Sequence, residues 1–205
     1  FIMKSLLIVL ALLSMSSVFA QNWSQPINVS NQDNTKNKLD FCVDNSGAIH
    51  CVWMGGDPIV YQIYYSRSND SGLTWSIPLQ ISDIDVYTRY YPKIIAANSG
   101  RLLVTYTCTY EGTETIRLKR FDGMVWGLEQ TISASQINSI NLALAIDYCD
   151  RVYSFWQVYE NPNGYKFNYV VISDDYISQI QSPFSCSPGN NLVYSVVADS
   201  IGNLH

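Results

Sequence analysis

The sequence contains little charge and almost no histidine. Only 14% of its 205 residues are charged and two are histidine, whereas soluble chains average about 25% charged residues. This composition excludes a disordered chain, a coiled coil and a long helical bundle, which all need more Glu, Lys and Ala. Basic residues are scarce too, with 12 against 17 acidic ones, and binding nucleic-acid phosphates requires clustered Lys and Arg. We therefore expect no nucleic-acid partner.

Cysteine is sparse and is not arranged for metal binding. The five cysteines form neither a CxxC pair nor a Cys/His cluster, so we expect no metal site, and nothing indicates a cofactor. Cys42 and Cys51 flank one predicted hairpin turn and could form a disulfide. The alternative is that most of the cysteines are small apolar residues buried in strands. The five are Cys42, Cys51, Cys108, Cys149 and Cys186.

The only long hydrophobic run stands at the start of the chain. Lys4 is followed by the apolar run Leu6–Leu13, and small residues recur at the end of Val18-Phe19-Ala20. This pattern predicts a signal peptide over 1–20 and a secreted, cell-surface or periplasmic protein. The alternative, a membrane anchor, would need about 20 apolar residues. We therefore expect no membrane span once the signal is removed.

A repeat is the main feature that is present. Turn-forming residues recur about every 51 residues, each between two apolar runs, which is a β-hairpin pattern. They are Gly47, Gly100, Asp150 and Gly202. A second landmark, a tryptophan that follows another strand-like run, recurs between them. Its copies are Trp23, Trp75 and Trp126. Each unit thus holds four short strands without helical periodicity, which is typical of a β-propeller blade.

The repeat predicts an all-β fold: a β-propeller of four-stranded antiparallel blades, of which about 3.5 are present. The partial propeller spans 21–205, with 22–30 as an outer strand that closes the ring. Propellers of this kind usually have six or more blades, so the predicted ring is incomplete. A four-bladed ring is the alternative. The predicted blades cover approximately 37–82, 91–133 and 140–183, and a fourth begins at 192–205.

One segment carries a known motif, the Asp-box Ser-x-Asp-x-Gly-x-Thr-Trp. Its residues are Ser68, Asp70, Gly72, Thr74 and Trp75. With this motif the chain resembles the sialidase-like β-propellers built of BNR repeats, over essentially all of 21–205. The resemblance implies a turn between the third and fourth strands of a blade. In such a turn the Asp side chain accepts backbone N–H bonds, the glycine allows positive φ, and the tryptophan packs beneath.

The resemblance also implies where a ligand would bind. In the family this is the end where the innermost strands converge, formed by the links between blades and the loops between second and third strands. Carboxylates beside exposed aromatic residues suit sugar binding, and a pair of carboxylates could hydrolyse a glycosidic bond. The alternative is that these are solvated loop charges and tyrosines packed between blades. The candidates are Trp53, Asp57, Asp85, Arg89, Tyr110, Glu111, Glu114, Tyr159 and Glu160.

Sialidase activity would require further residues. The family's enzymes use three arginines, an acid/base aspartate and a Tyr–Glu pair. The first arginine lies on the inner strand of the first blade, where this chain has Asn37-Lys38-Leu39-Asp40. Asp57 falls near the expected acid/base position and is the one catalytic candidate. His50 shares its repeat position with His205, so we interpret it as structural.

Two classes of function therefore stay open. The first is a secreted or cell-surface propeller module that binds glycans or an extracellular protein without catalysis. The second is an exo-glycosidase of the sialidase type. The absence of the first arginine motif favours the first class.

Overall fold

The computed structural model describes residues 25–31, 37–133, 139–160, 164–174, 176–186, 196–199 and 203–205. The predicted signal peptide, 1–20, lies outside the described residues. The predicted closing strand, 22–30, is described from residue 25 onward, and that part forms no strand.

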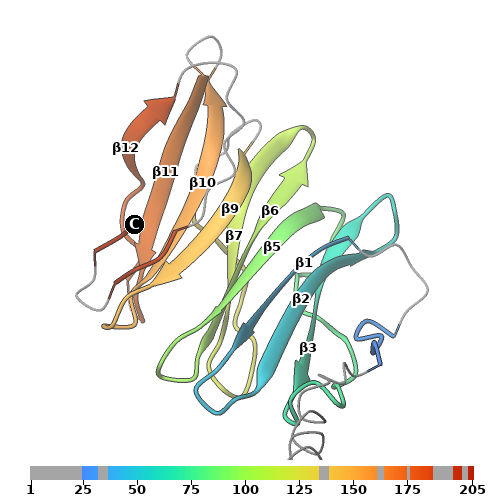
Figure 1. Cartoon of the computed structure of the whole chain (residues 1–205). Helices are drawn as coiled ribbons and strands as arrows, with labels where there is room; N and C mark the ends of the chain where they lie inside the picture. The colour runs from blue at the N-terminus through green and yellow to red at the C-terminus, as the bar shows by residue number, and fades with distance from the viewer. Residues whose placement is uncertain are drawn as a thin grey trace, which may run out of the picture.

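Three four-stranded antiparallel sheets follow one another along the chain and stack face to face (Figure 1). Blade 1 consists of β1 (Asn37–Val43), β2 (Ile49–Gly56), β3 (Tyr61–Ser68) and β4 (Leu79–Gln80). Blade 2 consists of β5 (Thr88–Ala96), β6 (Leu102–Tyr110), β7 (Thr113–Phe121) and β8 (Gln130–Thr131). Blade 3 consists of β9 (Ser139–Ile146), β10 (Val152–Glu160), β11 (Gly164–Ile172) and β12 (Gln181–Cys186). The predicted all-β architecture of four-stranded antiparallel blades is confirmed, and the described residues contain three such blades.

An aspartate shapes the turn between the first two strands of blade 1. The Asp44 carboxylate accepts the backbone N–H groups of Ser46 at 2.8 Å and Ala48 at 3.0 Å. Gly47 supplies the left-handed conformation that ends the turn, with φ of 83°. Asp147 caps the equivalent turn of blade 3 in the same way. The recurring turn residues of the sequence therefore mark real hairpins.

His50 is a structural residue, as its repeat position predicts. Its ring is 2% exposed, and its two nitrogens lie 3.0 Å from Asp44 Oδ2 and 2.8 Å from the Tyr65 hydroxyl. His205 makes the same contact with Asp199, at 3.1 Å. The backbones of Val197 and His205 exchange two hydrogen bonds in the manner of antiparallel strands.

The hydrophobic cores lie between the blades, because alternate residues of each strand face opposite neighbours. Leu102, Val104 and Tyr106 of β6 face blade 1 and are 0% exposed, whereas Leu103 faces blade 3. Trp156 of β10 is the largest fully buried side chain and packs against blade 2. Blade 2 is therefore held between blades 1 and 3, and each of those two packs on blade 2.

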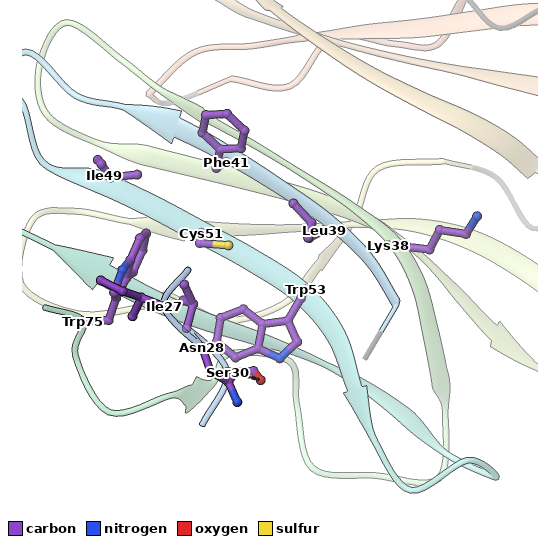
Figure 2. Close-up of a pocket in the computed structure, with 11 residues that line it drawn as sticks. Ile27, Asn28, Ser30, Lys38, Leu39, Phe41, Ile49, Cys51, Trp53 and Trp75 are labelled. Atoms are coloured by element: carbon purple, nitrogen blue, oxygen red, sulfur yellow. Dashed lines mark hydrogen bonds between the residues drawn. The ribbon is translucent and has the colours of Figure 1, made fainter. Parts of the chain in front are cut away.

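The face of blade 1 that points away from blade 2 is apolar, and its β1 side chains are exposed. Leu39, Phe41 and Val43 of β1 are 67%, 63% and 56% exposed. Leu39 and Phe41 line a groove of about 640 Å³ together with Trp53 and Trp75, and Ile27 of the preceding segment lies beside them (Figure 2). The β2 residues in this groove occupy the register that is fully buried in β6 of blade 2, so this is the blade-packing face of blade 1.

The predicted disulfide between Cys42 and Cys51 is wrong. Both thiols are free. In the β1–β2 ladder Cys42 pairs with His50, and Cys51 pairs with Phe41, so the two side chains leave opposite faces of the sheet. Cys42 packs toward blade 2, and Cys51 lines the outer groove.

Candidate functional site at the link end

The innermost strands of blades 1 and 2 carry the same irregularity where each begins. A β-bulge interrupts the pairing of β1 between Asn37 and Leu39, and that of β5 between Tyr90 and Lys93. Within the bulges, Lys38 and Tyr91 both adopt φ of 54°. For residues other than glycine this left-handed conformation costs about 1–3 kcal/mol and is concentrated at functional sites.

The two bulges bring their side chains together. The Lys38 ammonium lies 5.4 Å from the centre of the Tyr91 ring, a cation–π contact between neighbouring blades. The Tyr90 ring lies 6.0 Å from the rings of both Tyr91 and Tyr61. Tyr91 remains 41% exposed. Lys38, Tyr61, Tyr90 and Tyr91, here termed the axial cluster, thus form a partly exposed aromatic surface with a cation at its edge.

A second aromatic pair lies on blade 2 at the same end. Tyr87, in the link between blades 1 and 2, and Tyr110, at the end of β6, have ring centres 4.6 Å apart. The Arg89 guanidinium lies 5.9 Å from the Tyr87 ring. Tyr110 is 44% exposed, and the turn after it presents Glu111. The links between blades and the β2–β3 and β6–β7 turns lie at this end of the molecule. We call it the link end.

A buried ion-pair network supports this region. Arg89 is 0% exposed, and its two terminal nitrogens donate to Asp85 at 2.5 and 2.9 Å. Nη2 also donates to the two carboxylate oxygens of Glu129, at 3.1 and 3.3 Å. The Tyr106 hydroxyl donates to Glu129 Oε2 at 2.8 Å. The network therefore runs across the face of blade 2 that blade 1 covers.

The network shifts the pKa values of its members. Burial alone would lower the pKa of the Arg89 guanidinium, but the bonds from Asp85 and the charge of Glu129 outweigh it and raise that pKa. The hydrogen bonds from Arg89 hold the pKa of the Asp85 carboxyl below its ordinary value. Burial, reinforced by Glu129, raises the pKa of the Tyr106 hydroxyl. All three therefore keep their ordinary charge states at neutral pH.

The predicted ligand-face residues divide into distinct groups. Asp85 and Arg89 belong to the buried network, and Tyr110 and Glu111 lie at the surface beside it. Asp57 is exposed in the β2–β3 turn, where its carboxylate accepts the Ile59 N–H at 2.8 Å. The structure therefore brings the blade 2 residues together and leaves Asp57 on a separate turn.

The other predicted residues lie in strands and not in loops, because the strands run further than the sequence pattern indicated. Trp53 belongs to β2, is 4% exposed and stacks on Tyr64 with ring centres 6.1 Å apart. Glu114 lies in β7. Tyr159 lies in β10, with its ring 5.2 Å from that of Tyr165. Glu160 ends β10.

The Asp-box segment forms the turn between β3 and β4. The Asp70 carboxylate accepts the Thr74 N–H at 2.8 Å and the Thr74 hydroxyl at 2.6 Å. The Ser68 hydroxyl accepts the Gly72 N–H at 2.8 Å, and Trp75 Nε1 donates to the Gly72 carbonyl at 3.1 Å. The bonds from Thr74 hold the pKa of Asp70 at about 2. This turn lies at the opposite end of the molecule from the axial cluster.

Neither a metal-ligand cluster nor a membrane-spanning helix is found in the part of the chain that the structure describes. No group of three or more His, Cys, Asp or Glu side chains there comes together as potential metal ligands. Within the same residues, none of the helices is both long enough and apolar enough to cross a membrane.

These features define a β-propeller, and solved structures share the fold. The Penicillium chrysogenum alpha-L-arabinanase complexed with arabinobiose matches with a TM-score of 0.60 and 16% identity, over 75% of this chain and 52% of that one. An alpha-L-arabinofuranosidase from Fusarium graminearum matches with a TM-score of 0.59 and 13% identity, over 80% and 52%.

A protein of unknown function from Dyadobacter fermentans also matches, with a TM-score of 0.59 and 13% identity, over 77% of this chain and 44% of that one. No family model and no curated protein matches the sequence. The chain thus spans about half the length of these structures, and the likeness establishes its fold.

Proposed function

We propose that this chain is part of a secreted or cell-surface β-propeller that binds glycans at its link end. The axial cluster carries the proposal. It offers partly exposed tyrosine rings, which can stack on the apolar faces of sugar rings, and a lysine able to donate to hydroxyl groups. The backbone holds two of its members in a strained conformation, which is typical of functional sites.

The fold supports a carbohydrate ligand. The arabinanase and the arabinofuranosidase that share it both act on carbohydrate, and the former was solved with arabinobiose. Secretion is the expectation from the sequence, and an exported propeller would meet extracellular glycans.

The described carboxylates favour binding over hydrolysis. Asp85 is engaged by Arg89, Asp83 by Lys119 at 3.1 Å, and Asp40 by the Ile94 N–H at 2.9 Å. Hydrolysis by two carboxylates needs a pair about 5–10 Å apart with one of them free to move a proton. Asp57 and Glu111 stand on turns of different blades.

Binding can be measured by calorimetry with neutral and acidic oligosaccharides of defined length. We expect Tyr91→Ala to weaken binding about five- to thirtyfold, because removing a central aromatic contact costs about 1–2 kcal/mol. Tyr148→Ala is the matched control, because Tyr148 is 62% exposed in the β9–β10 turn at the opposite end. A wild-type protein that binds no glycan, or an equal loss in both variants, would contradict the proposal.

The second candidate is an exo-glycosidase of the sialidase type. The Asp-box turn and the exposed Asp57 favour it. Its test is turnover of a fluorogenic sialoside, which should disappear in Asp57→Asn. Glycan binding without turnover would support the first candidate instead.

A further inference from the structure

A polar crevice lies on blade 2, beside the link between blades 1 and 2. It has a volume of about 340 Å³, at the lower end of the range of about 300–1,000 Å³ for small-molecule pockets. Its size therefore suits one or two sugar rings. The lining residues are Tyr87, Cys108, Tyr110, Glu111, Thr113, Thr115 and Arg117.

The lining combines the groups that recognise sugars. Tyr87 and Tyr110 supply aromatic faces, and the threonines supply hydroxyls that both donate and accept. Glu111 supplies a carboxylate that can accept two sugar hydroxyls. It is exposed, and no ion pair involves it in the part of the chain that the structure describes. Its charge is therefore available to a ligand.

The buried network fixes one wall of the crevice, Tyr87, before any ligand binds. Although Tyr87 lies in a link, its carbonyl accepts from Arg89 Nη1 at 2.9 Å and from Gln62 Nε2 at 3.1 Å. Its N–H donates to Asp85 at 2.8 Å. The buried network thus fixes this tyrosine, and a fixed wall loses little conformational entropy when a ligand binds.

Arg117, which also lines the crevice, is fixed by neighbouring side chains as well. Its Nε donates to the Thr115 hydroxyl at 3.1 Å and lies 3.6 Å from Glu129. The guanidinium is thus already compensated, whereas the carboxylate of Glu111 is not. The crevice consequently presents excess negative charge, which disfavours an anionic ligand.

Glu129 and Arg117, which belong to the buried network and its surroundings, are not part of the blade repeat. The position of Glu129, three residues after Trp126, is occupied in blade 1 by Pro78, three residues after Trp75. Arg117 pairs with Tyr106 in blade 2, and the equivalent partner of Trp53 in blade 1 is Tyr64. Packing of the blades therefore does not require the Arg89 network. Its presence in blade 2 indicates a role that is specific to that blade.

We propose that the blade 2 crevice is a subsite for one neutral sugar residue of the bound glycan. Glu111 and Thr113 bind its hydroxyls, Tyr110 stacks against its ring, and the Arg89 network positions Tyr87. This inference rests on the proposed glycan binding and deepens it, because it names the class of sugar and a place distinct from the axial cluster.

The test is calorimetry on the whole chain with neutral oligosaccharides from arabinan, xylan and galactan, and with acidic oligogalacturonates. We expect the wild type to prefer a neutral ligand. Glu111→Gln and Thr113→Val should each weaken that ligand about tenfold, and Glu111→Gln should strengthen oligogalacturonate binding by removing repulsion. Both positions are exposed, and circular dichroism checks the fold. Asp174→Asn, which removes a carboxylate that is 64% exposed on blade 3, should change neither affinity.

The outcomes separate the two proposals. If Tyr91→Ala weakens binding while both crevice variants bind within twofold of the wild type, the subsite is overturned and glycan binding stands. A wild-type preference for oligogalacturonate overturns the subsite as well. If no oligosaccharide binds, both proposals fall.

Discussion

Replacing Arg89 by methionine tests the energetic role of the buried network. The change keeps the aliphatic stem but removes the guanidinium hydrogen bonds to Asp85, Glu129, Gln62 and the Tyr87 carbonyl. Glu129 is only 4% exposed, so its charge would stay buried with less compensation. Removing one partner of a buried ion pair costs about 3–5 kcal/mol.

We expect the loss of stability in Arg89→Met to lie at the lower end of that range. Asp85 is 32% exposed and regains water when Arg89 is lost, so its share of the loss is small. Glu129 also keeps the bond from Tyr106. We therefore expect Arg89→Met to lower the free energy of unfolding by about 3 kcal/mol, or the melting temperature by roughly 6–12 °C.

The assay is guanidinium unfolding followed by tryptophan fluorescence, with the single variants and their combination. Glu129→Gln should lower the free energy of unfolding less than Arg89→Met does, because Arg89 still has Asp85 as its ion-pair partner. The double variant should be more stable than additivity predicts, by about 1 kcal/mol or more, because its members interact directly. A loss below 1 kcal/mol for Arg89→Met with an unchanged denaturant slope would refute the reasoning.

Three further predictions concern stability. Glu111 and Gly112 form a two-residue turn with φ of 49° and 77°, so Glu111→Asn should raise the free energy of unfolding by about 1 kcal/mol in denaturant titrations, because asparagine tolerates this conformation. Burial lowers the pKa of His50 from 6.5, so the unfolded chain takes up a proton that the folded chain does not. Stability should therefore fall as the pH drops below about 6.5, and His50→Gln should remove that slope between pH 7.5 and 5.5. Trp156→Ala should cost about 3–5 kcal/mol by opening a cavity between blades 2 and 3, and an unchanged melting temperature would show that this interface adds little.

The fold was predictable because its signals are local and repeated. The Asp44–Gly47 turn and its copies give the hairpins, and alternating apolar residues give strands with two buried faces. Strand ends were less predictable. Trp53 and Tyr159 look like loop residues in sequence but lie in strands, because pairing with the next strand extends the regular backbone beyond the apolar run.

The site was predictable only in part, because its members come from distant positions. Tyr110 ends β6 and Glu111 follows it, so the alternation of strand directions assigns both to one end of the blade. The ion pair of Arg89 with Glu129 joins β5 to the residue just before β8, and no spacing rule indicates it. The bulge at Lys38 also has no sequence signal, since neither glycine nor asparagine occupies the strained position. The disulfide hypothesis, in contrast, could have been rejected from the hairpin register.

The sequential stacking of the blades has a consequence for how the molecule is made. Blades 1 and 3 each pack on blade 2, and every strand pairs with one next to it in the chain. A chain that leaves the ribosome from its N-terminus can therefore complete one blade before the next is synthesised. Until blade 2 arrives, Val52 and Ile63 of blade 1 have no cover. The most vulnerable moment in biosynthesis is thus the interval between two consecutive blades, and slowing translation there should increase aggregation.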